Sequence, residues 1–129
     1  MIAGIGHDLC DISRVERMLA GEAGPRFLRR ILTEEELDLA SALGGRRQAE
    51  FVAGRFAAKE AAVKALGCGI GASAGFRDVA ILRGPSGRPI CRLSARSAAV
   101  LGLHASAALH VSITHEQQLA SAFVVLETQ

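Results

Sequence analysis

The chain has 129 residues, of which 50% are hydrophobic and 22% charged, and its formal net charge is +2. This composition predicts one globular domain, spanning residues 1–129 with a modest core, and excludes a disordered chain. The weak net charge and the absence of Tyr and Trp argue against a nucleic-acid-binding protein, which needs a basic face and aromatic side chains for base stacking.

The N-terminus and the cysteines predict a cytoplasmic, soluble protein. Met1 is followed by a glycine-containing apolar segment without a basic region or an apolar stretch of signal-peptide length. No apolar run approaches the ~18 residues of a membrane span, so we expect no membrane association. Cys10, Cys68 and Cys91 are odd in number and lack zinc-ligand spacing, so neither a disulfide framework nor a zinc site is indicated.

The chain is predicted to begin with a strand and a helix. Residues 2–7 form a short apolar strand whose two glycines would let another backbone or a ligand approach closely, and Asp8 follows just past its end. Apolar residues at helical spacing predict a helix from about residue 11 or 13, and residues 21–25 interrupt it.

Two further helices are predicted before the middle of the chain. The segment Thr33–Glu36 has the spacing of a capping box, so a helix should run from there to about residue 43. The longest helix should begin between residues 46 and 48 and end at residue 66, where Gly67 can adopt the left-handed conformation of a helix end.

The C-terminal half is predicted to consist mostly of strands. Strands at 78–82 and 89–93 flank a Gly-Pro-Ser-Gly turn, and Ser94 can cap a short helix after them. Residues 110–115 alternate between apolar and polar side chains, and residues 119–127 form a last strand. We therefore predict an α+β fold in which the longest helix packs on a largely antiparallel sheet.

The lysines draw attention to one helix. Only two occur, Lys59 and Lys64, although lysine and arginine together number fifteen. Glu60 and Lys64 are four residues apart on the longest helix and share a face, so they form either a surface salt bridge or part of a site. Asp8 is either a helix cap or another member of that site. Two carboxylates with few other ligands suit Mg²⁺, which keeps waters and takes up substrate phosphates.

Nearby positive charge suits a phosphate-bearing ligand. Lys64 and Arg55 would supply charge, and the glycine-rich residues 67–71 would supply exposed backbone amides. His115, at the end of the polar face of the strand at 110–115, is either a structural histidine or a further ligand. Together these groups indicate phosphoryl-type transfer, in which positioning and charge neutralisation do most of the catalysis.

A basic segment forms a second feature. Residues 14–30 hold five arginines against Glu16 and Glu22, which gives a local charge of +3. The segment is either a solvated helix face or a docking patch for an acidic partner.

Several of these segments occur in the same order in one enzyme family. The longest helix contains FVAGRFAAKEAAVKALGCGI at Phe51–Ile70. Other matching segments are Gly4–Leu9 (GIGHDL), Arg30–Glu36 (RILTEEE), Gly87–Pro89 (GRP) and Val111–Glu116 (VSITHE). Over nearly its whole length the chain resembles the holo-acyl-carrier-protein synthases, the small class of 4′-phosphopantetheinyl transferases.

The resemblance implies an enzyme of fatty acid biosynthesis. It would move 4′-phosphopantetheine from coenzyme A to a serine of apo acyl carrier protein and release adenosine 3′,5′-bisphosphate. The resemblance makes Asp8 and Glu60 the Mg²⁺ ligands and places Lys64 at the coenzyme A phosphates. Either Lys64 or a water activated by Glu60 would be the base. The resemblance also implies which residues surround the nucleotide part of coenzyme A: Arg55, Gly67, Gly69, Ser112 and His115. Of these, His115 would lie near the 3′-phosphate.

The resemblance also implies partners. Arg14, Arg17 and Arg26 would face the carrier protein, an acidic helical partner, and the enzyme would be a homotrimer with active sites between subunits. Cys68 stands where the family usually has threonine, so that side-chain hydroxyl is missing here. Lys59, about 100° round the helix from Glu60, is expected to support a neighbouring subunit or the carrier.

Two other classes of function fit the same residues. A non-catalytic coenzyme A- or nucleotide-binding module would bind its ligand without needing Asp8 or Glu60. A Mg²⁺-dependent phosphohydrolase would release phosphate without any acceptor protein.

Overall fold

Five strands form one antiparallel sheet in the computed structural model, which describes all residues 1–129. The strand order is β1-β5-β4-β3-β2, and each neighbouring pair runs antiparallel. The long strands β1, β5 and β4 pair over most of their length, whereas β3 and β4 share a single pairing. The strands are β1 (Ile2–Asp11), β2 (Val79–Arg83), β3 (Pro89–Leu93), β4 (Ala108–His115) and β5 (Leu119–Glu127).

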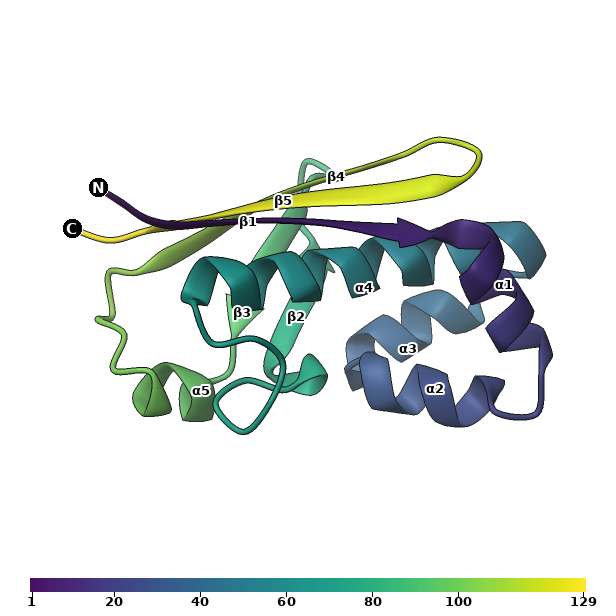
Figure 1. The fold of residues 1–129 in the computed structure, drawn as a ribbon, viewed down its shortest axis with the longest axis horizontal. Coiled ribbons are helices and arrows are strands. Elements are labelled where there is room, and N and C mark those ends of the chain that lie inside the picture. The colour runs from purple at the N-terminus through teal and green to yellow at the C-terminus, as the bar shows by residue number, and fades with distance from the viewer.

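The helices lie on one side of the long strands (Figure 1). The longest helix, α4, runs alongside β1, and α1, α2 and α3 gather near the end of β1 (Figure 1). The predicted α+β fold, with its longest helix packed on an antiparallel sheet, is therefore confirmed. The helices are α1 (Ile12–Ala20), α2 (Gly24–Ile31), α3 (Glu34–Ser41), α4 (Gly45–Leu66), the short 3₁₀ helix η1 (Phe76–Asp78) and α5 (Ala95–Val100).

Two glycines bring β1 into backbone contact with α4. A Cβ atom on Gly6 would lie 1.8 Å from the carbonyl oxygen of Ala61, and one on Gly4 would lie 1.9 Å from that of Ala65. Only glycine fits at such distances, which confirms the close approach predicted from the sequence. Because side chains alternate along a strand, Asp8 also faces α4.

Strand β1 is longer than predicted and contains Asp8 in its interior. Each residue from Gly4 to Asp11 has a partner on β5, and the pairing continues to Leu119. Asp11 is the cap of α1, since its side chain accepts a hydrogen bond from the Arg14 amide at 3.1 Å. The interpretation of Asp8 as a helix cap is therefore wrong.

Helix α2 was not predicted. The sequence suggested only an interruption at residues 21–25, but the helix begins at Gly24 with Pro25 in its first turn, where a missing amide hydrogen costs nothing. The predicted capping box is confirmed: Thr33 Oγ1 accepts from the Glu36 amide at 3.3 Å, and a carboxylate oxygen of Glu36 accepts from the Thr33 amide at 2.8 Å.

Small side chains fill the space between α4 and the sheet. Alanines of α4 are fully buried against β-branched residues of the sheet such as Val79, Ile81 and Val124. A second apolar cluster joins α1–α3 to the first half of α4. The opposite face of the sheet is not covered: Ile5, Leu9 and Phe123 are 56%, 55% and 44% exposed. None of the helices is both long enough and apolar enough to span a membrane.

Candidate functional site

Asp8 and Lys64 meet where β1 crosses α4. Lys64 Nζ lies 3.0 Å from Asp8 Oδ1 and donates to the His7 carbonyl oxygen at 2.9 Å. Glu60, one helical turn before Lys64, has no ion-pair partner. The interpretation of Glu60 and Lys64 as a surface salt bridge is therefore wrong, because the lysine pairs with the strand.

Glu60 and Asp8, here called the carboxylate pair, lie within electrostatic range of each other. Burial raises the pKa of Glu60, and the negative charge of Asp8 raises it further, while Lys64 partly opposes both. A divalent cation with oxygen ligands would relieve this repulsion. No group of three or more His, Cys, Asp or Glu side chains could hold a metal. The donor set therefore fits Mg²⁺, which completes its shell with waters and phosphate oxygens, better than a metal held by protein ligands alone.

A cationic pocket lies between α4 and the sheet. It measures about 190 Å³ and is lined by Arg55, Arg83 and His115 together with Gly87, Pro89 and Ile113. No carboxylate lines it. Because three groups that can carry positive charge converge without a carboxylate among them, the pocket suits an anion.

Arg55 is the most buried cation of this pocket. Its Nε is buried without a hydrogen-bond partner, and its guanidinium lies 4.1 Å from the centre of the Phe51 ring. Burial lowers the pKa of Arg55; the charge of Glu36 opposes this and that of Arg83 adds to it. A buried donor without a partner is costly, and an oxygen-rich anion in the pocket would satisfy it.

His115 and Ser112 lie on opposite faces of β4. His115 pairs with Ala120 and shares the inner face with Ile113, and its Nδ1 lies 3.9 Å from a carboxylate oxygen of Glu50. Ser112 pairs with Phe123 and is exposed on the uncovered face. The placement of His115 on the polar face was wrong, because residues two apart on a strand share a face. Ser112 is not brought to the Arg55 pocket within one chain.

The glycine turn after α4 has no free amides among its first three residues. The amides of Gly67, Cys68 and Gly69 donate to the carbonyl oxygens of Lys64 and Val63 at 3.0, 3.1 and 3.4 Å. The prediction of exposed amides is wrong for these three residues, since they satisfy carbonyl oxygens at the end of the helix. Gly67 and Gly69 have φ values of 78° and 66°, and a Cβ on either would meet nothing within 4 Å. The turn thus offers open space beside the backbone.

Lys59 lies in the protein interior, so its predicted role toward a neighbouring subunit or the carrier is wrong. It is 0% exposed, and its Nζ lies 2.5 Å from Glu36 Oε1. It also donates to the carbonyl oxygens of Ile31 at 2.8 Å and Phe76 at 3.0 Å. Glu36 in turn accepts from the Ile81 amide at 2.6 Å. Burial lowers the pKa of Lys59, and Glu36 opposes this.

One sequence signal pointed to this buried pair. Lys59 occupies a position three residues after Phe56 and four before Val63, within the apolar stripe of the longest helix. A charged residue inside an apolar stripe indicates a buried partner. Nothing in the sequence identified that partner as Glu36, because the capping box already accounted for its carboxylate.

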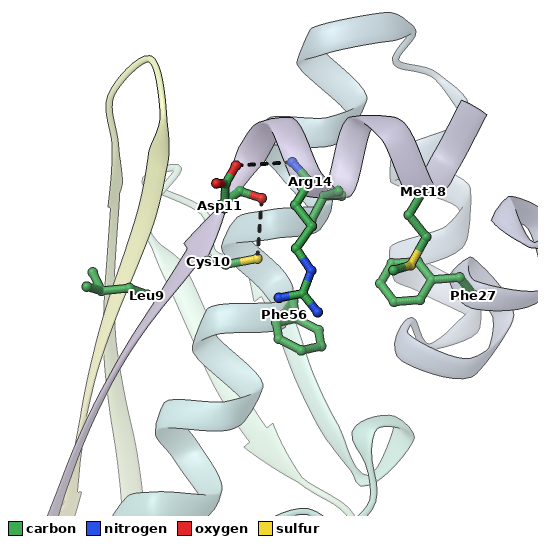
Figure 2. Close-up of a pocket in the computed structure, with 8 residues that line it drawn as sticks. Leu9, Cys10, Asp11, Arg14, Met18, Phe27 and Phe56 are labelled. Carbon is green, nitrogen blue, oxygen red and sulfur yellow. Dashed lines mark hydrogen bonds between the residues drawn. The ribbon is translucent and has the colours of Figure 1, made fainter. Parts of the chain in front are cut away.

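An apolar pocket lies beside the carboxylate pair. It measures about 140 Å³, and Met18, Phe27 and Phe56 line it together with Arg14. Figure 2 shows Met18 beside the Phe27 ring and the Arg14 guanidinium next to Phe56. Phe56 precedes Glu60 by four residues on α4, so the pocket and Glu60 are about 6 Å apart along one helix face.

Asp11 also lines this pocket, but the arginines of α1 and α2 form no ion pair with it. Arg14, Arg17 and Arg26 are exposed, and none forms an ion pair. Glu16 pairs with Arg46 of α4 at 3.2 Å, so it does not neutralise them. The structure therefore presents a positive surface with an apolar pocket in it.

Comparisons with known proteins assign the chain to a family. The family model described as the 4′-phosphopantetheinyl transferase superfamily matches residues 4–124. A holo-[acyl-carrier-protein] synthase of Halalkalibacterium halodurans is 43% identical over 127 residues, covering 98% of this chain and 97% of that protein.

Solved structures are similar over the whole chain. A holo-(acyl-carrier-protein) synthase of Bacillus anthracis, in complex with CoA (3′,5′-ADP), has a TM-score of 0.84 and 43% identity, covering 100% of this chain and 99% of that one. The holo-[acyl-carrier-protein] synthase of Neisseria meningitidis has a TM-score of 0.88 and 34% identity, with coverage of 99% and 100%.

Proposed function

The chain belongs to the 4′-phosphopantetheinyl transferase superfamily as a holo-[acyl-carrier-protein] synthase, and from this we propose its reaction and partners. The enzyme transfers 4′-phosphopantetheine from coenzyme A to a serine of apo acyl carrier protein. The serine oxygen attacks the β-phosphate, and adenosine 3′,5′-bisphosphate leaves. The reaction depends on Mg²⁺ and supports fatty acid biosynthesis; a cytoplasmic location stays a prediction.

The observation that carries this proposal is the group formed by Asp8, Glu60 and Lys64. The two carboxylates would hold Mg²⁺, which when bound neutralises charge on the phosphates. Lys64 adds positive charge at the transferring phosphate. We assign the base to Glu60 acting through a water, because Lys64 must stay protonated to supply positive charge at the phosphate.

The cationic pocket supports a nucleotide site. Arg55 and His115 were expected there from the sequence, and Arg83 lines the same pocket. We propose that the 3′-phosphate binds in it, because its charge and oxygen atoms would satisfy the buried Nε of Arg55. Gly67 and Gly69 would leave room for the ligand beside the end of α4 rather than donate to it.

The positive surface supports carrier docking. An acidic amphipathic helix would place carboxylates against Arg14, Arg17 and Arg26, and one apolar side chain would fill the pocket between Met18 and Phe56. Because this pocket lies one helical turn from Glu60, a carrier docked there would present its serine at the carboxylate pair.

The uncovered sheet face supports a homotrimer with active sites between subunits. Ile5, Leu9 and Phe123 form exposed apolar surface there, as expected of a subunit interface. Ser112 lies on the same face, where it could reach the site of a neighbouring subunit but not that of its own. Light scattering in solution tests this: a monomer at assay concentrations would contradict it.

A transfer assay tests the main claim. The protein is mixed with coenzyme A, Mg²⁺ and an apo carrier protein, and the carrier is followed by intact mass. A mass increase by one phosphopantetheine group supports the proposal, and no adduct on any acyl carrier protein contradicts it. Phosphate release without a carrier would indicate a phosphohydrolase, and metal-independent binding without turnover would indicate a binding module.

A substrate analogue tests the nucleotide site. Arg55→Met should raise the KM for coenzyme A strongly but leave that for 3′-dephospho-coenzyme A nearly unchanged, since the analogue lacks the phosphate. Equal increases for both substrates would contradict the assignment of the pocket.

A further inference from the structure

We propose that Lys64 moves between two anionic partners: it pairs with Asp8, as in this structure, and leaves Asp8 for the coenzyme A phosphates when the metal binds. The proposal rests on the proposed function, because it takes Asp8 as a metal ligand. Its new content is that one ammonium group links metal binding to phosphate binding.

The contacts of Lys64 suit such movement. Its Nζ makes two contacts, to Asp8 Oδ1 at 3.0 Å and to the His7 carbonyl oxygen at 2.9 Å, and both lie on β1. Its side chain is 51% exposed, so about half of its surface is free of packing. Lys59, with three hydrogen-bond partners and no exposure, is fixed in comparison.

Charge makes the two cations compete for one carboxylate. With Lys64 at 3.0 Å, the charge of Asp8 is already compensated. A divalent cation at the same carboxylate would meet the positive charge of Lys64 at short range, and like charges at such range repel strongly. Glu60 cannot take the ammonium as an alternative if it also binds the metal, so Lys64 needs another anion.

The phosphates of coenzyme A provide that anion. When a phosphate binds the Lys64 ammonium group, Asp8 is free to bind the metal. When the metal displaces Lys64 from Asp8, the ammonium group is free to bind the phosphate. By linkage, each ligand should therefore raise the affinity for the other. Part of this coupling should disappear when Lys64 is removed.

The two-lysine composition provides a direct test. Protein labelled with ¹³C at lysine Cε should give two lysine signals in a proton–carbon correlation spectrum, one from Lys59 and one from Lys64. Asp8→Asn should shift the Lys64 signal without metal. Saturating Mg²⁺ should move the Lys64 signal of the wild type toward its position in Asp8→Asn, while the buried Lys59 signal stays as an internal reference.

A binding measurement gives a second test. Calorimetry with Mn²⁺ and no coenzyme A should show about tenfold tighter binding to Lys64→Met than to the wild type, within the range of typical coupling between sites. Arg47→Met removes the same charge from an exposed position on the same helix and should leave Mn²⁺ affinity within about twofold. With coenzyme A present, the gain of Lys64→Met should shrink.

The outcomes separate the inference from the proposed function. The inference alone is overturned if the metal binds but saturating Mg²⁺ leaves the Lys64 signal unmoved. It is also overturned if Lys64→Met binds Mn²⁺ as tightly as the wild type or more weakly. A Lys64 signal that is the same in Asp8→Asn and wild type also overturns it. The absence of any Mn²⁺ or Mg²⁺ binding overturns both the inference and the metal dependence of the proposed reaction.

Discussion

Replacing Lys59 with methionine should destabilise the protein by about 3–5 kcal/mol, the range for breaking a buried ion pair on one side. Both side chains of the pair are 0% exposed, so solvent cannot compensate the carboxylate that remains. Glu36 would keep hydrogen bonds only from the Thr33 and Ile81 amides, and the carbonyl oxygens of Ile31 and Phe76 would lose their donor. Methionine fills most of the volume of lysine, which limits the contribution of a cavity.

The double variant Glu36→Gln/Lys59→Met separates the cost of the uncompensated Glu36 charge from the cost of the lost hydrogen bonds. It leaves no buried charge, and the glutamine oxygen can still accept from one backbone amide, so it should recover at least half of the loss. The exposed pair Arg77–Glu34, with side chains 52% and 87% exposed, provides the control: Arg77→Met should cost at most about 1 kcal/mol.

Urea unfolding at one fixed protein concentration, followed by circular dichroism, measures these differences; the fixed concentration matters if subunits associate. A Lys59→Met loss below about 1 kcal/mol would place the pair in the range of exposed pairs and refute the reasoning. No recovery in the double variant would show that lost hydrogen bonds, rather than the uncompensated charge, dominate.

Three further changes test other parts of the structure. Gly6→Ala should lower the free energy of unfolding in urea by about 3 kcal/mol or more, because its Cβ would lie 1.8 Å from a backbone oxygen of α4. Gly71→Ala is the control: its Cβ would meet nothing within 4 Å, so its stability should be nearly unchanged. Glu60→Gln should abolish transfer. Because the pKa of Glu60 is raised in the folded protein, its contribution to stability is full at low pH and is lost as the pH rises through that pKa. The variant should therefore melt slightly higher than the wild type at pH 8 but not at pH 4, and a large fall in melting temperature at pH 8 would contradict this. Arg14→Glu should raise the KM for the carrier about tenfold or more, with little change in the KM for coenzyme A, and this effect should weaken as salt is added. Arg47→Glu, the control, should leave the KM for the carrier unchanged. An unchanged carrier KM in Arg14→Glu would reject the docking surface.

Local signals in the sequence were sufficient for most of the fold. The capping box at Thr33 and Glu36 and the left-handed Gly67 fixed helix ends, because these depend on neighbouring residues. Helix α2 was missed, because Gly21, Gly24 and Pro25 lie before its arginines and apolar residues and were interpreted as a break. The end of β1 was placed too early, because its last four residues are strand only through pairing with β5.

In the candidate site, too, local features were predicted from the sequence and long-range contacts were not. Asp8, Glu60 and Lys64 were predicted as one group from spacing and family resemblance, and the structure brings Lys64 to Asp8. The actual partner of Lys64, the buried role of Lys59 and the cationic pocket that includes Arg83 depend on contacts between distant segments. Such contacts leave no local pattern, so the sequence could name the candidates but not pair them.

The most direct measurement follows both products of one reaction. Coenzyme A, Mg²⁺ and apo acyl carrier protein are incubated with the enzyme, and holo-carrier and adenosine 3′,5′-bisphosphate are quantified by mass spectrometry. We predict that the two form in equal amounts, and that Asp8→Asn and Glu60→Gln form neither although both variants remain folded. Unmodified carrier with the wild type, or undiminished transfer by either variant, would contradict the proposed reaction at this site.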